Sequence, residues 1–187
     1  MYFACELLSK KENLHRIPIL NDQNQLVSVF SQSFMLNYIT ESDSKIGTKL
    51  NKPISECTHF FKPVATVQEY TLTINAFNEM VSKNITGVAV VSEKNQIIGS
   101  LSLRDLKEIV DQKEMFKILF KNVKDFLKDL DNERPRKIIT VQKEDTLKMA
   151  IDNLKIMKVH RIFIVDKQSN PIGVISLKDI LFEIIHD

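Results

Sequence analysis

The chain has 187 residues, of which 43% are hydrophobic and 27% charged, with four Gly and five Pro. This is the composition of an ordinary globular protein, and it argues against disorder and low complexity. The length allows one domain or two small ones and excludes a large multidomain enzyme. The formal net charge is +2 and no dense basic run occurs, so nucleic-acid binding is not expected.

Two cysteines, Cys5 and Cys57, have no partner at metal-ligand spacing. Neither a disulfide framework nor a zinc site is therefore predicted. No apolar run approaches the roughly 18 to 20 residues that span a bilayer, and the N-terminus does not have the pattern of a signal peptide. We expect reduced thiols, no membrane association, and a location in the cytoplasm or the nucleus.

An incomplete copy of a repeated unit occupies residues 1–50. Its apolar segments 15–20 and 26–31 lie 71 positions before the segments 86–91 and 97–102. The same subtraction places the opening strand of this copy before Met1, so we expect the chain to be the C-terminal piece of a longer protein or a chain cut there. The remaining helix and two strands are expected to dock onto the complete units, because an isolated apolar hairpin exposes apolar surface.

Two complete copies follow, related by a constant offset of 74 positions. The run 85–91 (Ile-Thr-Gly-Val-Ala-Val-Val) corresponds to the run 159–165 (Val-His-Arg-Ile-Phe-Ile-Val). The same offset relates Thr66 to Thr140, Ala76 to Ala150, Gly99 to Gly173, Ser102 to Ser176 and Asp105 to Asp179. A repeat with a constant offset predicts a tandem architecture, whatever the assignment of any single helix or strand.

Each complete copy, 53–112 and 134–187, is predicted to run strand, helix, strand, strand, helix. The helices are predicted from apolar residues at i, i+4 and i+7 or i+8, and the strands from Val and Ile enrichment. The predicted strands are 64–67, 86–91, 96–101, 138–141, 161–165 and 172–175, and the predicted helices are 71–82, 103–112, 145–157 and 177–186. Residues 113–133 carry apolar residues at helical spacing and are predicted to form a connecting helix.

In both copies a Gly-led strand ends in Ser-x-x-Asp, as Ser102–Asp105 and Ser176–Asp179. The start of a helix presents free N–H groups and partial positive charge. The two oxygens of an aspartate placed there can accept from the adjacent hydroxyls of a ribose. Ser-x-x-Asp is also close to a capping box, which explains either motif taken alone. Their recurrence in register favours a ligand site.

Two His-Arg doublets, His15-Arg16 and His160-Arg161, begin equivalent strands. The planar guanidinium group suits phosphate, and the neighbouring imidazole can add a donor. Solvated surface residues are the alternative, and the shared register favours phosphate contacts.

Motifs for catalysis are not found. The sequence holds no phosphate-binding P-loop, no dinucleotide-binding glycine pattern and no Gly-x-Ser-x-Gly. His59 and His186 have no partner in the repeat, and we expect them to be structural or exposed. No catalytic residue and no metal ligand is assigned, and the protein is not expected to be an enzyme.

The repeat resembles the cystathionine β-synthase (CBS) domain, a module that works in pairs and binds adenosine-containing ligands. This resemblance implies an α/β (α+β) fold in which tandem β-α-β-β-α repeats form a Bateman-type pair, with a partial repeat at the N-terminus. More narrowly, residues 159–181 resemble the last repeat, and residues 15–19 the second repeat, of the γ subunit of AMP-activated protein kinase.

In that family, clefts between paired repeats bind AMP, ADP or ATP, and the resemblance implies two such sites and no other cofactor. One site would combine Asp105 and Ser102 at the ribose, Arg16, His160 and Arg161 at the phosphates, and Ile139 and Val159 at the base. The other would combine Asp179 and Ser176 at the ribose, His15 near the phosphates, and Thr86, Ala65, Ile85 and Val174 around the base.

The sequence also departs from the family pattern. Phe34 stands 71 positions before Asp105, where a carboxylate would be needed, so the N-terminal copy is expected to bind no nucleotide there. Residues 83–86 replace a His-Arg doublet, and the basic residue expected ahead of the last repeat has only Arg134 and Arg136 as candidates.

The leading hypothesis is a non-catalytic module that senses AMP, ADP or ATP, with kinase catalytic and scaffold subunits as partners. One alternative is a stand-alone, enzyme-attached or channel-attached CBS pair that binds another adenosyl ligand, such as S-adenosylmethionine. A ligand without phosphate would be indifferent to Arg16 and Arg161. A third alternative is a structural pair that only dimerises, and a homodimer through paired CBS repeats is consistent with any of the three.

Overall fold

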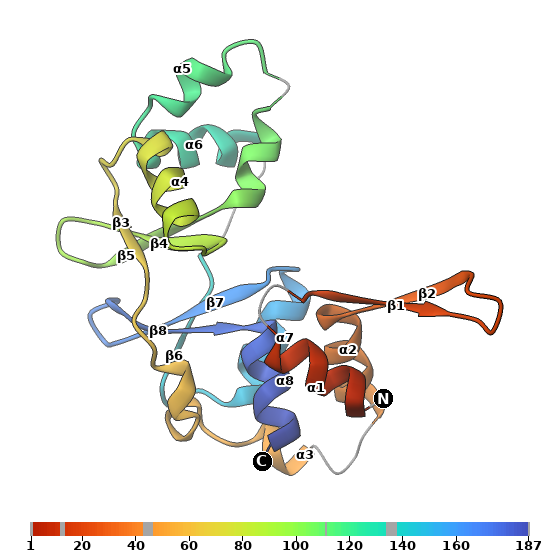
Figure 1. The fold of residues 1–187 in the computed structure, drawn as a ribbon. Helices are drawn as coiled ribbons and strands as arrows, with labels where there is room; N and C mark the ends of the chain where they lie inside the picture. The colour runs from red at the N-terminus through yellow and green to blue at the C-terminus, as the bar shows by residue number, and fades with distance from the viewer. Residues whose placement is uncertain (1, 12–13, 43–46, 111, 134–137, 187) are drawn as a thin grey trace. The chain divides into compact units, whose positions relative to one another are not determined.

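The computed structural model describes residues 2–11, 14–42, 47–110, 112–133 and 138–186 (Figure 1). The chain divides into two compact units, which are described separately below. Unit 1 comprises residues 1–62, 141–164 and 173–187, and unit 2 comprises residues 63–140 and 165–172.

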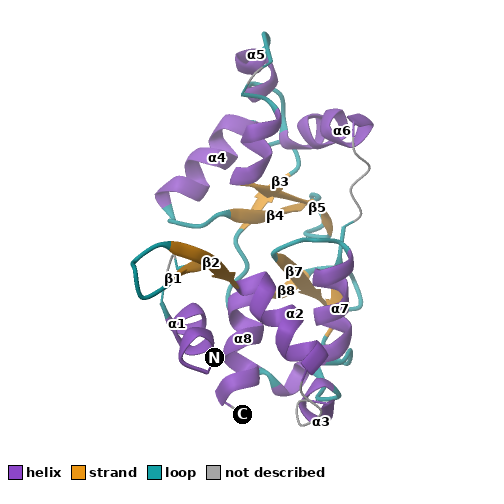
Figure 2. Cartoon of the chain, turned by 90° about the vertical axis from the view of Figure 1, so that its right-hand side faces the viewer, coloured by secondary structure: helices purple, strands orange, loops and turns teal. Residues whose placement is uncertain are grey.

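Unit 1 begins with helix α1 (Tyr2–Lys10), the antiparallel strands β1 (Arg16–Leu20) and β2 (Leu26–Ser31), and helix α2 (Gln32–Ser42). The short helix α3 (Gly47–Leu50) and the 3₁₀ helices η1 (Ile54–Glu56) and η2 (Thr58–Phe60) follow. Its C-terminal part contains α7 (Leu147–Ile156) and α8 (Leu177–His186). Helices α1 and α2 pack against α8 (Figure 2), so the helical part of the N-terminal copy docks as predicted. Its two strands are expected to dock as well, but the hairpin leaves Leu26 and Val27 exposed.

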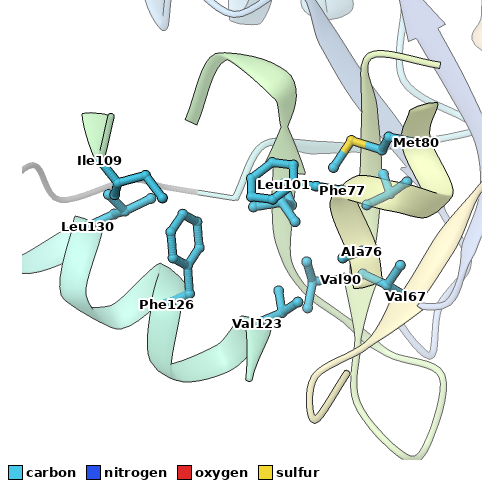
Figure 3. Packing of buried hydrophobic residues seen from close by; sticks show 11 residues of the cluster. Val67, Ala76, Phe77, Met80, Val90, Leu101, Ile109, Val123, Phe126 and Leu130 are labelled. Carbon is cyan, nitrogen blue, oxygen red and sulfur yellow. The ribbon is translucent and has the colours of Figure 1, made fainter. Parts of the chain in front are cut away.

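Unit 2 contains β3 (Thr66–Gln68), α4 (Thr73–Ser82), β4 (Gly87–Val91), β5 (Ile97–Ser102), η3 (Leu103–Glu108), α5 (Met115–Leu119) and α6 (Val123–Glu133). Strand β4 pairs parallel with β3 and antiparallel with β5. The apolar faces of helices α4 and α6 pack together with this sheet to form a buried core (Figure 3). Within it the rings of Phe77 and Phe126 meet edge to face, with their centroids 6.0 Å apart. Both rings are at least nine-tenths buried.

A third sheet has the same strand order as β3-β4-β5. It consists of β6 (Thr140–Gln142), β7 (Arg161–Val165) and β8 (Pro171–Ser176), in the order β6-β7-β8. The turn between β7 and β8 belongs to unit 2, where the backbone N–H of Ile97 donates to the carbonyl oxygen of Ser169 at 2.9 Å. The tandem β-α-β-β-α architecture predicted from the repeat is confirmed.

The offsets of the repeat hold at the level of hydrogen-bond register. Arg16 pairs with Ser31 as Gly87 pairs with Ser102, and a register shift precedes the last pair of each hairpin. The hairpin turns place Asn24, Asn95 and Ser169 at φ angles of 59°, 61° and 67°. These three residues are 71 and 74 positions apart. The same left-handed residue therefore closes all three hairpins, at a conformation that asparagine tolerates better than most residues.

The predicted connecting helix over 113–133 is wrong in one respect, because the structure divides it into α5 and α6. Asn122 immediately precedes α6 and caps it, because its Oδ1 accepts the backbone N–H of Asp125 at 2.8 Å. Helix α6 then supplies Val123, Phe126 and Leu130 to the core of unit 2. The segment is thus part of a folded unit and not a packed linker alone.

The segment that begins α6 has a counterpart 69 positions earlier. In unit 2, backbone N–H groups of Thr73 and Val123 donate to the carbonyls of Lys121 and Thr71, both at 2.9 Å. In unit 1, those of Leu147 and Ile54 donate to the carbonyls of Lys52 and Asp145, at 2.9 and 2.8 Å. Residues 52–55 therefore join the copy that follows much later in the chain, whereas residues 121–124 join the copy that precedes them.

The predicted helix over 103–112 is shorter than expected and is the 3₁₀ helix η3, ending at Glu108. The equivalent helix α8 runs for three turns because Leu181 and Ile184 are buried. The residues 74 positions earlier are Lys107 and Val110, both exposed, so burial of an apolar face does not extend the first-copy helix.

The sheet of the N-terminal copy has two strands, and its β1 edge carries Pro18. Pro18 lies 71 positions before Ala89, whose N–H donates to the carbonyl of Ala65, next to β3, at 2.9 Å. Proline has no N–H, so β1 cannot make this bond. The hairpin also exposes apolar side chains, among them Leu26 at 63% and Val27 at 58%.

Gly99 and Gly173 occupy equivalent positions in different surroundings. A Cβ at Gly173 would lie 2.7 Å from the backbone oxygen of Phe60 and 2.8 Å from Ile164 Cδ1. A Cβ at Gly99 would lie 2.7 Å from Leu127 Cδ1, the end of a flexible side chain.

We expect Gly173→Ala to lower the free energy of unfolding by about 1–3 kcal/mol in urea titrations, and Gly99→Ala to lower it by less. Equal losses in the two variants would contradict this account.

Candidate functional site

The two Ser-x-x-Asp motifs form the same turn where a strand gives way to a helix. In unit 2, the backbone N–H and the Oγ of Ser102 donate to Asp105 Oδ2 at 2.7 and 3.1 Å. In unit 1, the same groups of Ser176 donate to Asp179 Oδ2 at 2.8 and 2.6 Å. Both motifs act as helix caps, as the capping alternative predicts, and each carboxylate is thereby held in one orientation.

Each turn is hydrogen-bonded to the residue immediately before the first strand of its hairpin, β1, β4 or β7. The carbonyls of His15, Thr86 and His160 accept the backbone N–H groups of Gln32, Leu103 and Leu177 at 3.2, 3.1 and 3.3 Å. These residues are equivalent in the three copies. Within unit 2 the structure brings Thr86 to the Asp105 turn, and within unit 1 it brings His160 to the Asp179 turn.

Each predicted ligand set draws residues from both units. In the first set, Asp105, Ser102 and Ile139 belong to unit 2, and Arg16, Val159, His160 and Arg161 to unit 1. In the second set, Asp179, Ser176, Val174 and His15 belong to unit 1, and Thr86, Ala65 and Ile85 to unit 2. The assembly of either complete set stays a prediction.

The predicted phosphate ligands are mostly on the surface. His15, Arg16 and His160 are exposed, and Arg161 is half-buried. Burial lowers the pKa of Arg161, and the nearby carboxylate of Asp179 opposes this shift. The guanidinium group of Arg161 and the carboxylate of Asp179 therefore act on each other in unit 1.

Of the predicted base contacts, Thr86 is polar and exposed, and the others are half-buried apolar side chains: Ala65, Ile85, Ile139, Val159 and Val174. Ala65 and Ile85 pack against the core of unit 2. Partly exposed aliphatic side chains of this kind offer a surface for an aromatic ring while keeping their inner atoms in the core.

Lys62 is a partner of Asp179 that the sequence analysis did not identify. Its Nζ lies 2.7 Å from Asp179 Oδ1 and 2.9 Å from Oδ2. Lys62 falls between η2 and β3, outside every repeated motif, so neither register nor spacing marks it. Only the placement of residues 52–62 against α8 reveals the contact.

A buried carboxylate, Glu183, lies one turn further along α8. It accepts hydrogen bonds from Lys52 Nζ at 2.8 Å and from Cys57 Sγ at 3.3 Å, and His59 Nδ1 lies 3.2 Å from its other oxygen. His59 Nε2 lies 3.4 Å from the backbone oxygen of Asp179. His59 is thus structural, as predicted, and it links the η1–η2 segment to the helix that begins at the Asp179 turn.

In the N-terminal copy, Phe34 occupies the position of the carboxylate. Its backbone N–H donates to Ser31 Oγ at 3.1 Å, so the turn is retained. The ring of Phe34 stacks on those of Phe30 and Tyr38, with centroids 5.3 and 6.5 Å apart. An aromatic ring cannot accept hydrogen bonds from a ribose diol as a carboxylate does. That no nucleotide binds there stays a prediction.

Within the part of the chain that the structure describes, no helix is both long and apolar enough to cross a bilayer, and no three His, Cys, Asp or Glu side chains gather as a metal site would require. Arg134 and Arg136, the candidate basic residues of the connector, lie outside the described residues.

Tandem strand–turn–helix repeats with an aspartate at the turn define a class of paired ligand-binding modules. The model of the CBS domain family matches residues 58–112 and 127–186, and the chain belongs to this family. The second match begins inside α6. The chain is also distantly related to the γ subunits of AMP-activated and SNF1-related protein kinases.

Among relatives, SNF1-related protein kinase regulatory subunit gamma-1 of Arabidopsis thaliana is 27% identical over 208 residues, which cover all of this chain and 48% of that protein. 5'-AMP-activated protein kinase subunit gamma-3 of Sus scrofa is 26% identical over 91% of this chain and 34% of its own length. The chain thus spans half or less of these relatives.

Solved structures agree on the fold. Protein MJ1225 from Methanocaldococcus jannaschii superposes with a TM-score of 0.76 at 20% identity, over 96% of this chain and 62% of that one. CBSX2, solved in complex with AMP, gives a TM-score of 0.56 at 22% identity, over 70% and 93% of the two chains. The CBS domain pair of protein MJ0100 was solved with 5-methylthioadenosine and S-adenosyl-L-methionine. It superposes with a TM-score of 0.54 at 16% sequence identity, over 69% of this chain and 92% of that one.

Replacing Glu183 tests how strongly its cluster holds unit 1 together. Glu183→Gln removes the charge that faces Lys52 and His59, and we expect a loss of about 3 kcal/mol in the free energy of unfolding, because breaking a buried ion pair leaves its partner desolvated. The matched control is Glu144→Gln, whose carboxylate is exposed and 3.9 Å from Lys143. The control is expected to lose less than about 1 kcal/mol. A Glu183→Gln protein as stable as the control would contradict the assignment.

Proposed function

We propose that this chain is a non-catalytic regulatory module that binds AMP, ADP or ATP. The observation that carries the proposal is the Ser-x-x-Asp turn, which occurs in both complete repeats with its carboxylate fixed at the start of a helix. Membership of the CBS domain family supports it, because the related fold of CBSX2 was solved with AMP.

The capping bonds and ribose binding are compatible. A carboxylate offers about four acceptor positions, and the serine donors use those of Oδ2. Holding the carboxylate in place before the ligand arrives lowers the entropy lost on binding. The cap thus becomes a pre-organised acceptor for a vicinal diol, and the helix start adds partial positive charge.

The two His-Arg doublets are proposed to take the phosphates. His15, Arg16 and His160 are exposed at the beginnings of β1 and β7, and Arg161 is half-buried at the first position of β7. The charge of Arg161 also interacts with the carboxylate of Asp179. The ribose and the phosphate of one nucleotide would therefore bind to neighbouring groups.

Regulation is proposed to follow from differential affinity. A nucleotide that binds one arrangement of an assembly more tightly than another shifts the population towards it. The relatives include γ subunits of AMP-activated and SNF1-related kinases, so kinase catalytic and scaffold subunits are the proposed partners.

A second candidate is the binding of a different adenosyl ligand. The related pair from MJ0100 was solved with 5-methylthioadenosine and S-adenosyl-L-methionine, which share the adenosine ribose but carry no phosphate. Such ligands would use Asp105 or Asp179 and would be insensitive to replacement of Arg16 or Arg161.

Calorimetric titration with AMP, ADP, ATP and S-adenosylmethionine tests the two candidates. If the aspartates hold the ribose, Asp105→Ala or Asp179→Ala is expected to weaken binding by about 1.5 to 3 kcal/mol, roughly 10- to 150-fold, because charge-assisted hydrogen bonds are lost. Unchanged affinity in both variants would overturn the site assignment.

Asp152→Ala is the matched control, because Asp152 is exposed on α7 and belongs to neither turn. Because alanine also removes a cap, Asp→Asn variants and thermal melting separate lost folding from lost binding. Tighter binding of S-adenosylmethionine than of any nucleotide, unaffected by Arg161→Ala, would favour the second candidate.

A further inference from the structure

The carboxylate of Asp179 is occupied by a lysine in this structure. Lys62 Nζ lies 2.7 Å from Oδ1 and 2.9 Å from Oδ2, so one ammonium group contacts both oxygens. The side chain of Lys62 is 45% exposed, whereas that of Asp179 is 13% exposed. The lysine approaches from solvent onto a carboxylate that the turn already holds.

The donors around Asp179 leave little room for another pair. Ser176 contributes two bonds to Oδ2, from its N–H and its Oγ, and Lys62 contributes one to each oxygen. Three of these four hydrogen bonds go to Oδ2 and one goes to Oδ1, and together they match the roughly four acceptor positions of a carboxylate. A ribose diol brings two O–H donors, so some of the present donors must leave before it binds.

Of these donors, Lys62 is the one that can leave. The two donors of Ser176 are fixed by the three-residue turn that they close. The ammonium of Lys62 ends a flexible four-carbon stem and is partly in water, where an ion pair costs little to break.

We infer that Lys62 is a charge-selecting residue of the Asp179 site, an inference that rests on the proposed function. It covers the carboxylate in the absence of ligand and moves off when a ribose binds. A neutral adenosine must displace the ammonium and offers it no new counter-charge. A nucleotide displaces it in the same way but carries a phosphate that the ammonium can pair with. The site therefore favours anionic nucleotides over neutral nucleosides.

Arg161 reinforces this selection. It is a second cation that acts on Asp179, and it belongs to the same unit. Displacing Lys62 with a neutral ligand leaves its ammonium without a counter-charge near a second cation. A phosphate supplies the missing negative charge.

The test compares AMP and adenosine binding by calorimetry in an Asp105→Ala background, which isolates the Asp179 site. Lys62→Met removes the ammonium and keeps the stem. Loss of a partly exposed ion pair corresponds to roughly 3-fold. Adenosine is therefore expected to bind about 3-fold more tightly, whereas AMP, which exchanges the pair with Asp179 for a pair with phosphate, is expected to change little, so that the ratio of their affinities falls about 3-fold.

Lys148→Met is the matched control, because Lys148 is exposed on α7 and the substitution removes the same charge. A ratio in Lys62→Met that equals the ratio in Lys148→Met would overturn the role of Lys62 while leaving the proposed function intact. Absence of AMP binding in the Asp105→Ala protein, or AMP binding that survives Asp179→Ala in that background, would overturn the proposed function at this site and the inference with it.

Discussion

One backbone hydrogen bond recurs where each of the three hairpins leads into the helix that follows it, and the candidate site depends on it. The carbonyls of His15, Thr86 and His160 each accept the N–H of the first residue of the helix that follows the hairpin. The bond closes a loop made of two strands and a turn, so the chain enters the helix at a fixed place beside the first strand. A serine and an aspartate at this place acquire a defined geometry because the backbone has already been fixed around them.

The consequence is that capping and the proposed ligand recognition use the same carboxylate. Ser102 and Ser176 orient their aspartates, and the orientation is the one a helix start requires. A helix cap is present whether or not a ligand binds, so a binding surface built on it needs little reorganisation. The N-terminal copy shows the separation of the two roles, since Ser31 retains the turn and Phe34 replaces the carboxylate.

The repeat made most of the fold predictable from sequence. Offsets of 71 and 74 located the strands, the hairpins and the two Ser–Asp turns, because each of these depends on residues within one copy. The contacts that could not be predicted join segments that no offset relates. Lys62 meets Asp179 across more than a hundred positions, and Glu183 collects Lys52, Cys57 and His59 in the same way. The short η3 was missed because a periodic pattern does not show which apolar positions will find a surface to cover.

The edge of β1 shows how an exposed apolar hairpin is kept apart from other strands. Its partner β2 presents Leu26 and Val27 to solvent, and two-stranded sheets with such surfaces are open templates for pairing with neighbouring chains. Pro18 stands where the equivalent strand β4 uses a backbone N–H to hold its parallel neighbour. An intruding strand would lose that bond and meet the pyrrolidine ring instead. A single imino acid thus makes the β1 edge a poorer template for a further strand without altering the register of the repeat.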